Sequence, residues 1–133
     1  MSANIEELER DSTIQIVLDY LVLNNFEKIK ADIYGYNLPA KIYWNGLHEG
    51  FTPDISCTKG DKKFIFRIET EYSIKDKNSE KIWKLFAANA GEFEREFHLI
   101  VPNNYQYSLR ERLVNLQIKA IVEGINKYCR ILT

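Results

Sequence analysis

Residues 51–72 decide the fold of this chain, and they read FTPDISCTKGDKKFIFRIETEY. Two segments, 51–57 and 63–72, flank a Lys-Gly-Asp turn sequence, a pattern that predicts a β-hairpin. Successive side chains of a strand point to opposite faces of the sheet. We therefore expect Arg67, Glu69 and Glu71 on one face of the second strand, and Phe66 and Ile68 on the other.

Upstream of this hairpin the sequence predicts one helix and two further strands. Asn4 is the predicted N-cap, with Glu7 three residues later, and apolar residues of 14–21 fall on one helical stripe. From residue 28 to 34 apolar residues recur at every second position, and 40–45 alternate in the same way before a Gly turn. The middle of the chain is thus expected to form an antiparallel meander.

Downstream, residues 82–93 carry apolar side chains at helical spacing, and residues 97–101 are a short apolar run that stops at Pro102. Such a run is typical of a strand that is covered on both faces of a sheet. Because the helix separates this strand from the hairpin, the connection is a crossover, and the strand is expected to run parallel to a strand of the meander.

The last quarter of the chain predicts a helix and a strand. Ser108 and Glu111 have capping-box spacing, and the helix is expected to end near Gly124, with a final strand over 128–132. The whole order predicts one domain, residues 1–133, of the α/β (α+β) class. We expect three layers, helix-sheet-helix, around a mixed central sheet.

The composition is that of an ordinary globular protein: 133 residues, 45% apolar, 28% charged, net charge −1. No apolar run is long enough to cross a bilayer and the N-terminus is acidic, so we expect no membrane association and a cytoplasmic location. The charge is not the strongly basic balance of a dedicated nucleic-acid binder. Cys57 and Cys129 have no cysteine or histidine cluster around them, so both are expected to be buried thiols.

Three carboxylates are candidates for chemistry. Asp54 follows Pro53 at the start of one strand of the hairpin, and Glu69 and Glu71 come late in the other. Oxygen ligands that converge at one end of a sheet suit a hard divalent cation, Mg²⁺ or Mn²⁺. The same spacing also fits a solvated strand face on which Arg67 balances the two glutamates.

These residues resemble a known motif. Pro53-Asp54, fourteen intervening residues and then Glu69-x-Glu71, set in the order αβββαβ, resemble the PD-(D/E)xK nuclease superfamily with its restriction-endonuclease-like fold. The resemblance implies that Asp54 and Glu69 bind Mg²⁺ or Mn²⁺. Glu71 stands where the family has its lysine, and family members with a migrated lysine point to Lys84, or else Lys81, on the following helix.

Two functions follow from this resemblance. The first is a metal-dependent endonuclease that hydrolyses the phosphodiester bonds of DNA, with Asp54 and Glu69 as metal ligands and Glu71 and Lys84 as catalytic groups. A chain of this size would need a homodimer or a larger partner for specificity. The alternative is a catalytically inactive endonuclease-like domain that acts as a regulatory or protein-interaction module.

The two histidines are weaker candidates. His48, in the loop before Pro53, is expected to be an idle surface residue, and His98 lies within the apolar strand, so it is expected to be a packed residue with one satisfied nitrogen.

Overall fold

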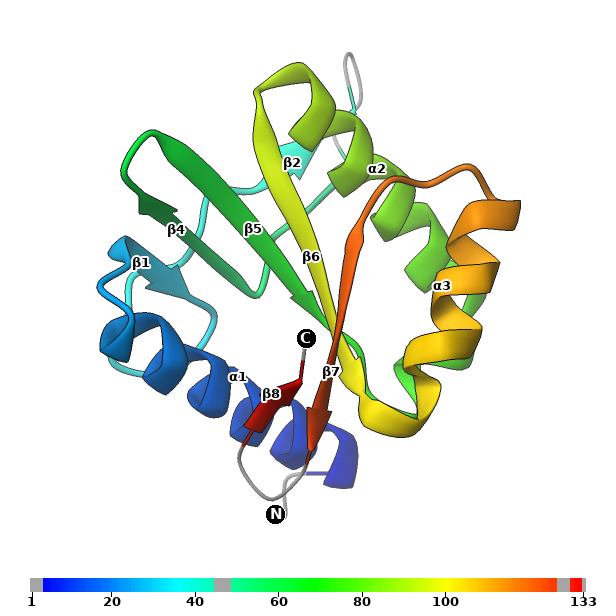
Figure 1. Cartoon of the computed structure of the whole chain (residues 1–133), viewed down its shortest axis with the longest axis horizontal. Coiled ribbons are helices and arrows are strands. Elements are labelled where there is room, and N and C mark those ends of the chain that lie inside the picture. The colour runs from blue at the N-terminus through cyan, green and yellow to red at the C-terminus, as the bar shows by residue number, and fades with distance from the viewer. Residues whose placement is uncertain (1–3, 45–48, 127–129, 133) are drawn as a thin grey trace.

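The computed structural model describes residues 4–44, 49–126 and 130–132. In the described chain the first helix is followed by a run of strands, after which helices and strands alternate (Figure 1). In chain order the elements are α1 (Ile5–Leu23), β1 (Glu27–Ala31), β2 (Ile42–Tyr43), β3 (Gly50–Phe51), β4 (Ile55–Lys59), β5 (Lys62–Ile68), α2 (Lys77–Glu92), β6 (Arg95–Pro102), α3 (Gln106–Asn115), β7 (Ile121–Asn126) and β8 (Arg130–Leu132). Short 3₁₀ turns, Ser73–Lys75 and Asn103–Tyr105, precede α2 and α3.

The main sheet has six strands in the order β1-β4-β5-β6-β7-β8. β1, β4 and β5 are mutually antiparallel, β6 and β7 run parallel to β5, and β8 is antiparallel to β7. The mixed sheet, the β4–β5 hairpin and the parallel crossover through α2 are therefore confirmed. Because β4 and β5 are antiparallel, the start of β4 and the end of β5 lie at the same end of the sheet.

α1 forms as the sequence predicts. The Asn4 side chain accepts a hydrogen bond from the Glu7 backbone N–H at 2.7 Å, and the helix ends at Leu23, before Asn25 adopts a positive φ of 63°. The expected stripe is fully buried, and it consists of Ile14, Val17, Leu18 and Leu21. The packing of this stripe fixes the position of α1 on the sheet. It also fixes the polar side chains that lie one turn closer to the N-terminus of the helix.

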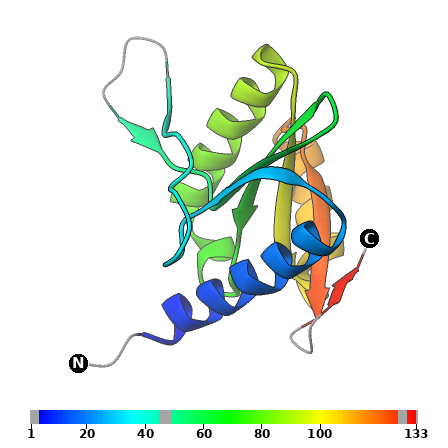
Figure 2. The same ribbon diagram turned by 90° about the vertical axis from the view of Figure 1, so that its left-hand side faces the viewer.

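Each face of the sheet has its own hydrophobic core. Figure 2 shows α1 and α2 on opposite sides of the sheet. On one side the α1 stripe packs against Phe64, Phe66, Ile68 and Ile100, and on the other side α2 and α3 pack against the alternate residues of β5, β6 and β7. The arrangement is thus helix-sheet-helix, with β6 covered on both faces. Cys57 lies in the first core, where burial raises the pKa of its thiol to about 12. Cys129 lies outside the described residues.

The expected meander is wrong in one part. β1 pairs with β4, whereas β2 and β3 pair with each other in a separate two-stranded sheet. The β1–β4 pairing continues past Ala31, since the Asp32 N–H donates to the Asp54 carbonyl at 2.9 Å. β1 is an edge strand, and on its outer side the Ala31 N–H donates to the Asn37 carbonyl at 2.9 Å, so a loop and not residues 40–44 occupies that position. The strands of the main sheet therefore keep their sequence order, with β2 and β3 left out.

The third helix also differs from the prediction. It begins at Gln106, so Ser108 lies inside its first turn and donates to the Tyr105 carbonyl at 3.2 Å instead of capping the helix. It ends at Asn115, two residues before Gln117 adopts a positive φ of 57°. Gly124 belongs to β7, which pairs in parallel with β6. The predicted last strand is present as β8, although residues 128 and 129 lie outside the described chain.

Among the described residues, none of the helices combines the length and apolar character that a membrane crossing requires.

Candidate functional site

Asp54 lies in the bend that leads into β4, and it is fully buried. Its backbone N–H donates to the Phe66 carbonyl at 2.9 Å, which ties the bend to β5. One carboxylate oxygen, Oδ2, accepts from the Ile68 N–H at 2.6 Å, and the other, Oδ1, forms a close ion pair with the Arg10 guanidinium of α1. Both oxygens of this carboxylate therefore have a protein donor.

Burial and charge act on the Asp54 carboxyl in opposite directions. Removal from water raises its pKa, and the charges of Arg10 and Arg67 and the Ile68 N–H oppose that rise in part. The same Arg10 nitrogen lies 3.0 Å from Asp32 Oδ2, so Arg10 bridges the buried carboxylate to an exposed one. An arginine anchored on α1 thus compensates the charge at the start of β4.

Glu69 follows the last residue of β5, and its side chain has no exposed surface. Its N–H donates to the Ile100 carbonyl at 2.9 Å, which extends the parallel pairing with β6 by one bond. Four side-chain contacts surround the carboxylate: Oε2 accepts from Arg67 Nε at 2.8 Å and Trp83 Nε1 at 2.7 Å, and Oε1 accepts from Ser73 Oγ at 2.6 Å and Ser79 Oγ at 3.3 Å. Glu69 is the centre of a satisfied buried network.

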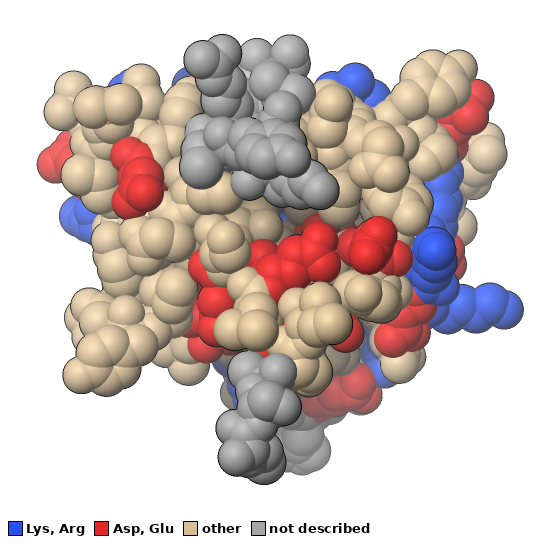
Figure 3. All heavy atoms as spheres, turned by 90° about the horizontal axis from the view of Figure 1, so that it is seen from below, with Lys and Arg blue, Asp and Glu red and all other residues tan. Residues whose placement is uncertain are grey.

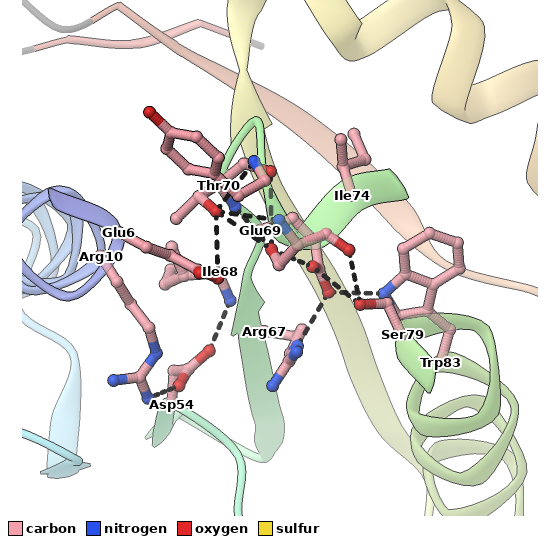
Figure 4. Close-up of polar contacts among 12 residues, drawn as sticks. Glu6, Arg10, Asp54, Arg67, Ile68, Glu69, Thr70, Ile74, Ser79 and Trp83 are labelled. Atoms are coloured by element: carbon pink, nitrogen blue, oxygen red, sulfur yellow. Dashed lines mark hydrogen bonds and ion pairs between the residues drawn. The ribbon is translucent and has the colours of Figure 1, made fainter. Parts of the chain in front are cut away.

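Arg67 lies between the two buried carboxylates (Figure 4). It is hydrogen-bonded to Glu69, and its charge also lowers the pKa of Asp54. Asp54, Arg67 and Glu69 thus gather at one end of the sheet, as the strand alternation predicts for the latter two. The positive charge between the Asp54 and Glu69 carboxylates is thus supplied by the side chain of Arg67.

Glu71 is not part of this group. β5 ends at Ile68, and the Thr70 hydroxyl accepts from the N–H groups of Tyr72 and Ser73 at 3.2 and 3.1 Å, which turns the chain. The expected alternation therefore fails beyond Glu69, and Glu71 is exposed. Its carboxylate raises the pKa of the Tyr72 hydroxyl, to which it is hydrogen-bonded.

Further carboxylates lie close to Glu71 on the surface. Glu9 and Glu6 also raise the pKa of Tyr72, so the start of α1 and this turn form one acidic surface. Figure 3 shows acidic side chains gathered on this side of the molecule. Thr70 Oγ1 lies 3.5 Å from Glu6 Oε1, which connects this surface to the residue beside buried Glu69.

The lysines expected to replace the motif lysine face elsewhere. Lys84 is exposed on α2, and within the described chain no hydrogen bond or ion pair joins it to Asp54 or Glu69. Lys81 is paired with Glu49, with Nζ 2.7 Å from Oε1. His48 lies outside the described residues.

As a chemical unit the site is an alternating set of charges: Arg10, Asp54, Arg67 and Glu69. Among residues 4–44, 49–126 and 130–132, no group of three or more histidine, cysteine or carboxylate side chains is arranged to hold a metal ion. Any cation that bound to Asp54 and Glu69 would have to displace Arg10 and Arg67 from them.

Arg10 was not among the residues predicted from the sequence. A signal was present, because Arg10 lies four residues before Ile14 and seven before Val17, on the same helical stripe as the buried residues of α1. A cation on an apolar stripe requires a buried partner. Ser79 and Trp83, which donate to Glu69 from α2, were harder to predict, because their spacing of one helical turn is the only sequence pattern that connects them.

Comparisons with protein-family models, with curated proteins and with solved structures found no match to this chain.

Proposed function

We propose that this chain is a non-catalytic domain with an endonuclease-like architecture, and that it acts by binding, as a regulatory or protein-interaction module. One observation carries the proposal: Arg10 and Arg67 neutralise the two carboxylates, Asp54 and Glu69, that would hold the catalytic metal.

The order of the elements supports the endonuclease-like part. α1, β1, β4, β5, α2 and β6 follow one another as αβββαβ if the β2–β3 pair is treated as an insertion between the first two strands. The three antiparallel strands followed by a parallel strand agree with the architecture that the PD-(D/E)xK resemblance implies. Asp54 and Glu69 come from adjacent antiparallel strands at one end of the sheet.

The hydrogen-bonding of the carboxylates supports the non-catalytic part. Mg²⁺ requires nearly octahedral oxygen ligation and usually keeps several waters. All four oxygens of Asp54 and Glu69 already accept hydrogen bonds from protein groups, and both side chains are buried. Breaking one buried ion pair costs about 3 to 5 kcal/mol, so a metal ion would have to offset two such losses. The charges of Arg10 and Arg67 therefore compensate these carboxylates in place of a metal ion.

A metal-dependent DNA endonuclease is the second candidate. It is favoured by the position of Asp54 and Glu69 at the same end of the sheet, where the resemblance expects metal ligands. In that case Mg²⁺ or Mn²⁺ would be held by these two carboxylates after Arg10 and Arg67 had moved away. Glu71 and Lys84 are exposed, so any catalytic contribution from them requires a substrate to reach their surfaces.

A metal titration distinguishes the two functions. We expect the melting temperature of the wild-type protein to stay constant between metal-free buffer and about 5 mM Mg²⁺ or Mn²⁺, since a ligand stabilises only the state that binds it. We also expect plasmid DNA incubated with Mn²⁺ to remain intact. A rise in melting temperature, together with cleavage that Glu69→Gln abolishes and Lys77→Gln preserves, would establish the endonuclease instead.

A further inference from the structure

The face of the sheet that packs against α2 has an uncovered part, and it forms an open groove of about 460 Å³. β1, β4, β5 and the start of β6 contribute its lining. Four cationic side chains line the groove together with two hydroxyls: Lys28, Lys30, Lys63, Arg95, Ser56 and Thr58. This groove is separate from the residues of the candidate site, and the inference drawn from it goes beyond the proposed function.

The strand register explains why these side chains meet. Lys30 on β1 is opposite Ser56 on β4, and Thr58 on β4 is opposite Lys63 on β5. Lys63 is in turn opposite Arg95 on β6. Residues directly opposite each other share a face of the sheet, and so do residues two apart on one strand. The register therefore places Lys30, Lys63 and Arg95 on a single face.

The sizes of the side chains give the groove its shape. The small hydroxyl residues of β4, Ser56 and Thr58, form the floor, and the long cationic side chains rise from the strands on either side. Neighbouring strands lie about 4.8 Å apart, so the backbone of β1 is separated from those of β5 and β6 by roughly 10 to 15 Å. This width accommodates a chain of phosphate groups above the hydroxyls of β4.

Lys28 enters the groove from an irregular part of β1. The register shifts between Glu27 and Lys30, and Lys28 has a positive φ of 52°, which a lysine rarely adopts. β-Bulges re-aim side chains at sheet edges. Glu27 is opposite Thr58 on the same edge, but it is not among the residues that line the groove. The bulge thus adds a second lysine to the β1 side.

The charges of the groove are not compensated within the described part of the chain. Lys28, Lys30 and Lys63 make no ion pair there, and Arg95 donates to a neutral acceptor, Asn89 Oδ1, at 3.4 Å. In contrast, Lys62, which alternates to the other face of β5, lies 3.8 Å from a Glu96 carboxylate oxygen. Four positive charges around a hydroxyl floor are therefore available to an anion in a protein whose net charge is −1.

We propose that this groove binds closely spaced phosphate groups, either of a free polyphosphate or nucleotide or of a nucleic-acid backbone. Lysine and arginine form strong charge-assisted hydrogen bonds with phosphate oxygens, and the Ser56 hydroxyl adds a neutral donor, whereas the Thr58 hydroxyl donates to the Glu27 carbonyl at 3.4 Å. Among the described residues that line the groove, Phe64 is the only aromatic one, and it is buried in the core on the α1 side. Recognition thus depends on phosphate charge, without stacking of bases.

The test measures binding of two probes by the full chain in buffer with about 50 mM salt and no divalent metal. Inorganic tripolyphosphate is titrated by calorimetry, and a fluorescent single-stranded oligothymidylate of about twelve nucleotides is followed by anisotropy. We expect at least one probe to bind. Tighter binding of the oligonucleotide assigns the groove to a nucleic-acid backbone, whereas tighter binding of tripolyphosphate assigns it to a free phosphorylated ligand.

A pair of double variants locates the binding. Lys30→Gln/Lys63→Gln removes one cation from each side of the groove, and it should lower the affinity for the probe that binds by about tenfold or more. If that probe is the oligonucleotide, the salt slope should fall by about 1.4, since each lost contact to a single strand contributes about 0.7. Lys77→Gln/Lys119→Gln removes the same charge from exposed positions elsewhere. This control should change the affinity less than about twofold.

All four lysines are exposed, so both double variants should melt as the wild type does. The proposal is overturned if neither probe binds, or if the control weakens binding as much as the groove variant.

Discussion

Arg67 and Glu69 form an ion pair across two residues at the end of β5, with Nε of Arg67 2.8 Å from Oε2 of Glu69. Glu69 is completely buried at the side chain and Arg67 is 18% exposed. The alternation of a strand places residues two apart on one face, so the pair is local in sequence. The charge of the same guanidinium lowers the pKa of a second buried carboxylate, Asp54. The guanidinium of Arg67 therefore compensates both buried carboxylates at this end of the sheet.

The first prediction concerns the pair formed by Arg10 and Asp54. Arg10→Met should lower the free energy of unfolding by about 3 to 5 kcal/mol, because it leaves the Asp54 carboxylate buried without its main cation. Asp54→Asn should also destabilise, and the double variant should lose less than the sum of the two single changes. Urea unfolding of the four proteins in this cycle measures the coupling.

A control for this cycle is available on the same helix. Arg10 also lies 3.8 Å from Asp11, whose side chain is 54% exposed, and an exposed pair of this kind contributes about 0 to 1 kcal/mol. Asp11→Asn should therefore change stability far less than Asp54→Asn. If the two substitutions changed stability equally, the burial of Asp54 would not strengthen its pairing with Arg10.

The second prediction concerns the donors around Glu69. Trp83→Phe keeps the ring in the core but removes the Nε1–H group that donates to Oε2 at 2.7 Å, and it should cost about 1 to 3 kcal/mol. Ser79→Ala is not a matched control, because it removes both the 3.3 Å contact to Oε1 and the 2.7 Å bond from Ser79 Oγ to the Ser73 carbonyl. Chemical denaturation measures the loss in Trp83→Phe, and a change below about 0.5 kcal/mol would show that Glu69 does not depend on the indole N–H.

Much of this site could be predicted from local sequence. Arg67 and Glu69 share a strand face by period, and the N-cap at Asn4 and the stripe from Ile14 to Leu21 fix the orientation of α1. Each of these inferences uses residues close together in the chain. They were confirmed because local periodicity determines which face of an element is buried.

The remainder depends on contacts distant in sequence. Asp54 pairs with Arg10, 44 residues away, and one of the Glu69 donors on α2 is Trp83, 14 residues away. No local pattern indicates which cation a buried carboxylate will find. The prediction for Glu71 was wrong for another reason: the Thr70 hydroxyl accepts hydrogen bonds in a turn that ends the strand at Ile68, four residues before the predicted end.

The third prediction uses the residues that lie away from the buried network. Glu71→Lys and Lys84→Ala change exposed side chains, so each should alter the free energy of unfolding by no more than about 0.5 kcal/mol. Glu71→Lys should in addition lower the pKa of Tyr72, because it removes the carboxylate that raises it. Thermal melts and an NMR titration of labelled tyrosine measure the two effects. A large loss of stability in Glu71→Lys would place Glu71 within the network around Glu69.

The last prediction is a pH dependence that originates at His98. Both ring nitrogens of His98 contact carboxylates: Nδ1 lies close to Oε1 of Glu123 on β7, and Nε2 lies 3.1 Å from Oε1 of Glu96. The expected packed histidine therefore has two satisfied nitrogens instead of one. Burial lowers the pKa of His98, but the hydrogen bonds and charges of Glu123 and Glu96 outweigh it, and the pKa is raised from the usual 6.5.

A raised histidine pKa means that the folded protein binds the proton more tightly than the unfolded chain does. The resulting stabilisation is complete below pH 6.5 and is lost as the pH rises through the higher pKa of the folded state. Urea unfolding between about pH 6 and pH 9 should therefore show a decline in wild-type stability that is smaller in Glu123→Gln, because that variant loses the larger of the two carboxylate contributions. His98→Asn should remove the decline, and an unchanged decline in both variants would assign it to other groups.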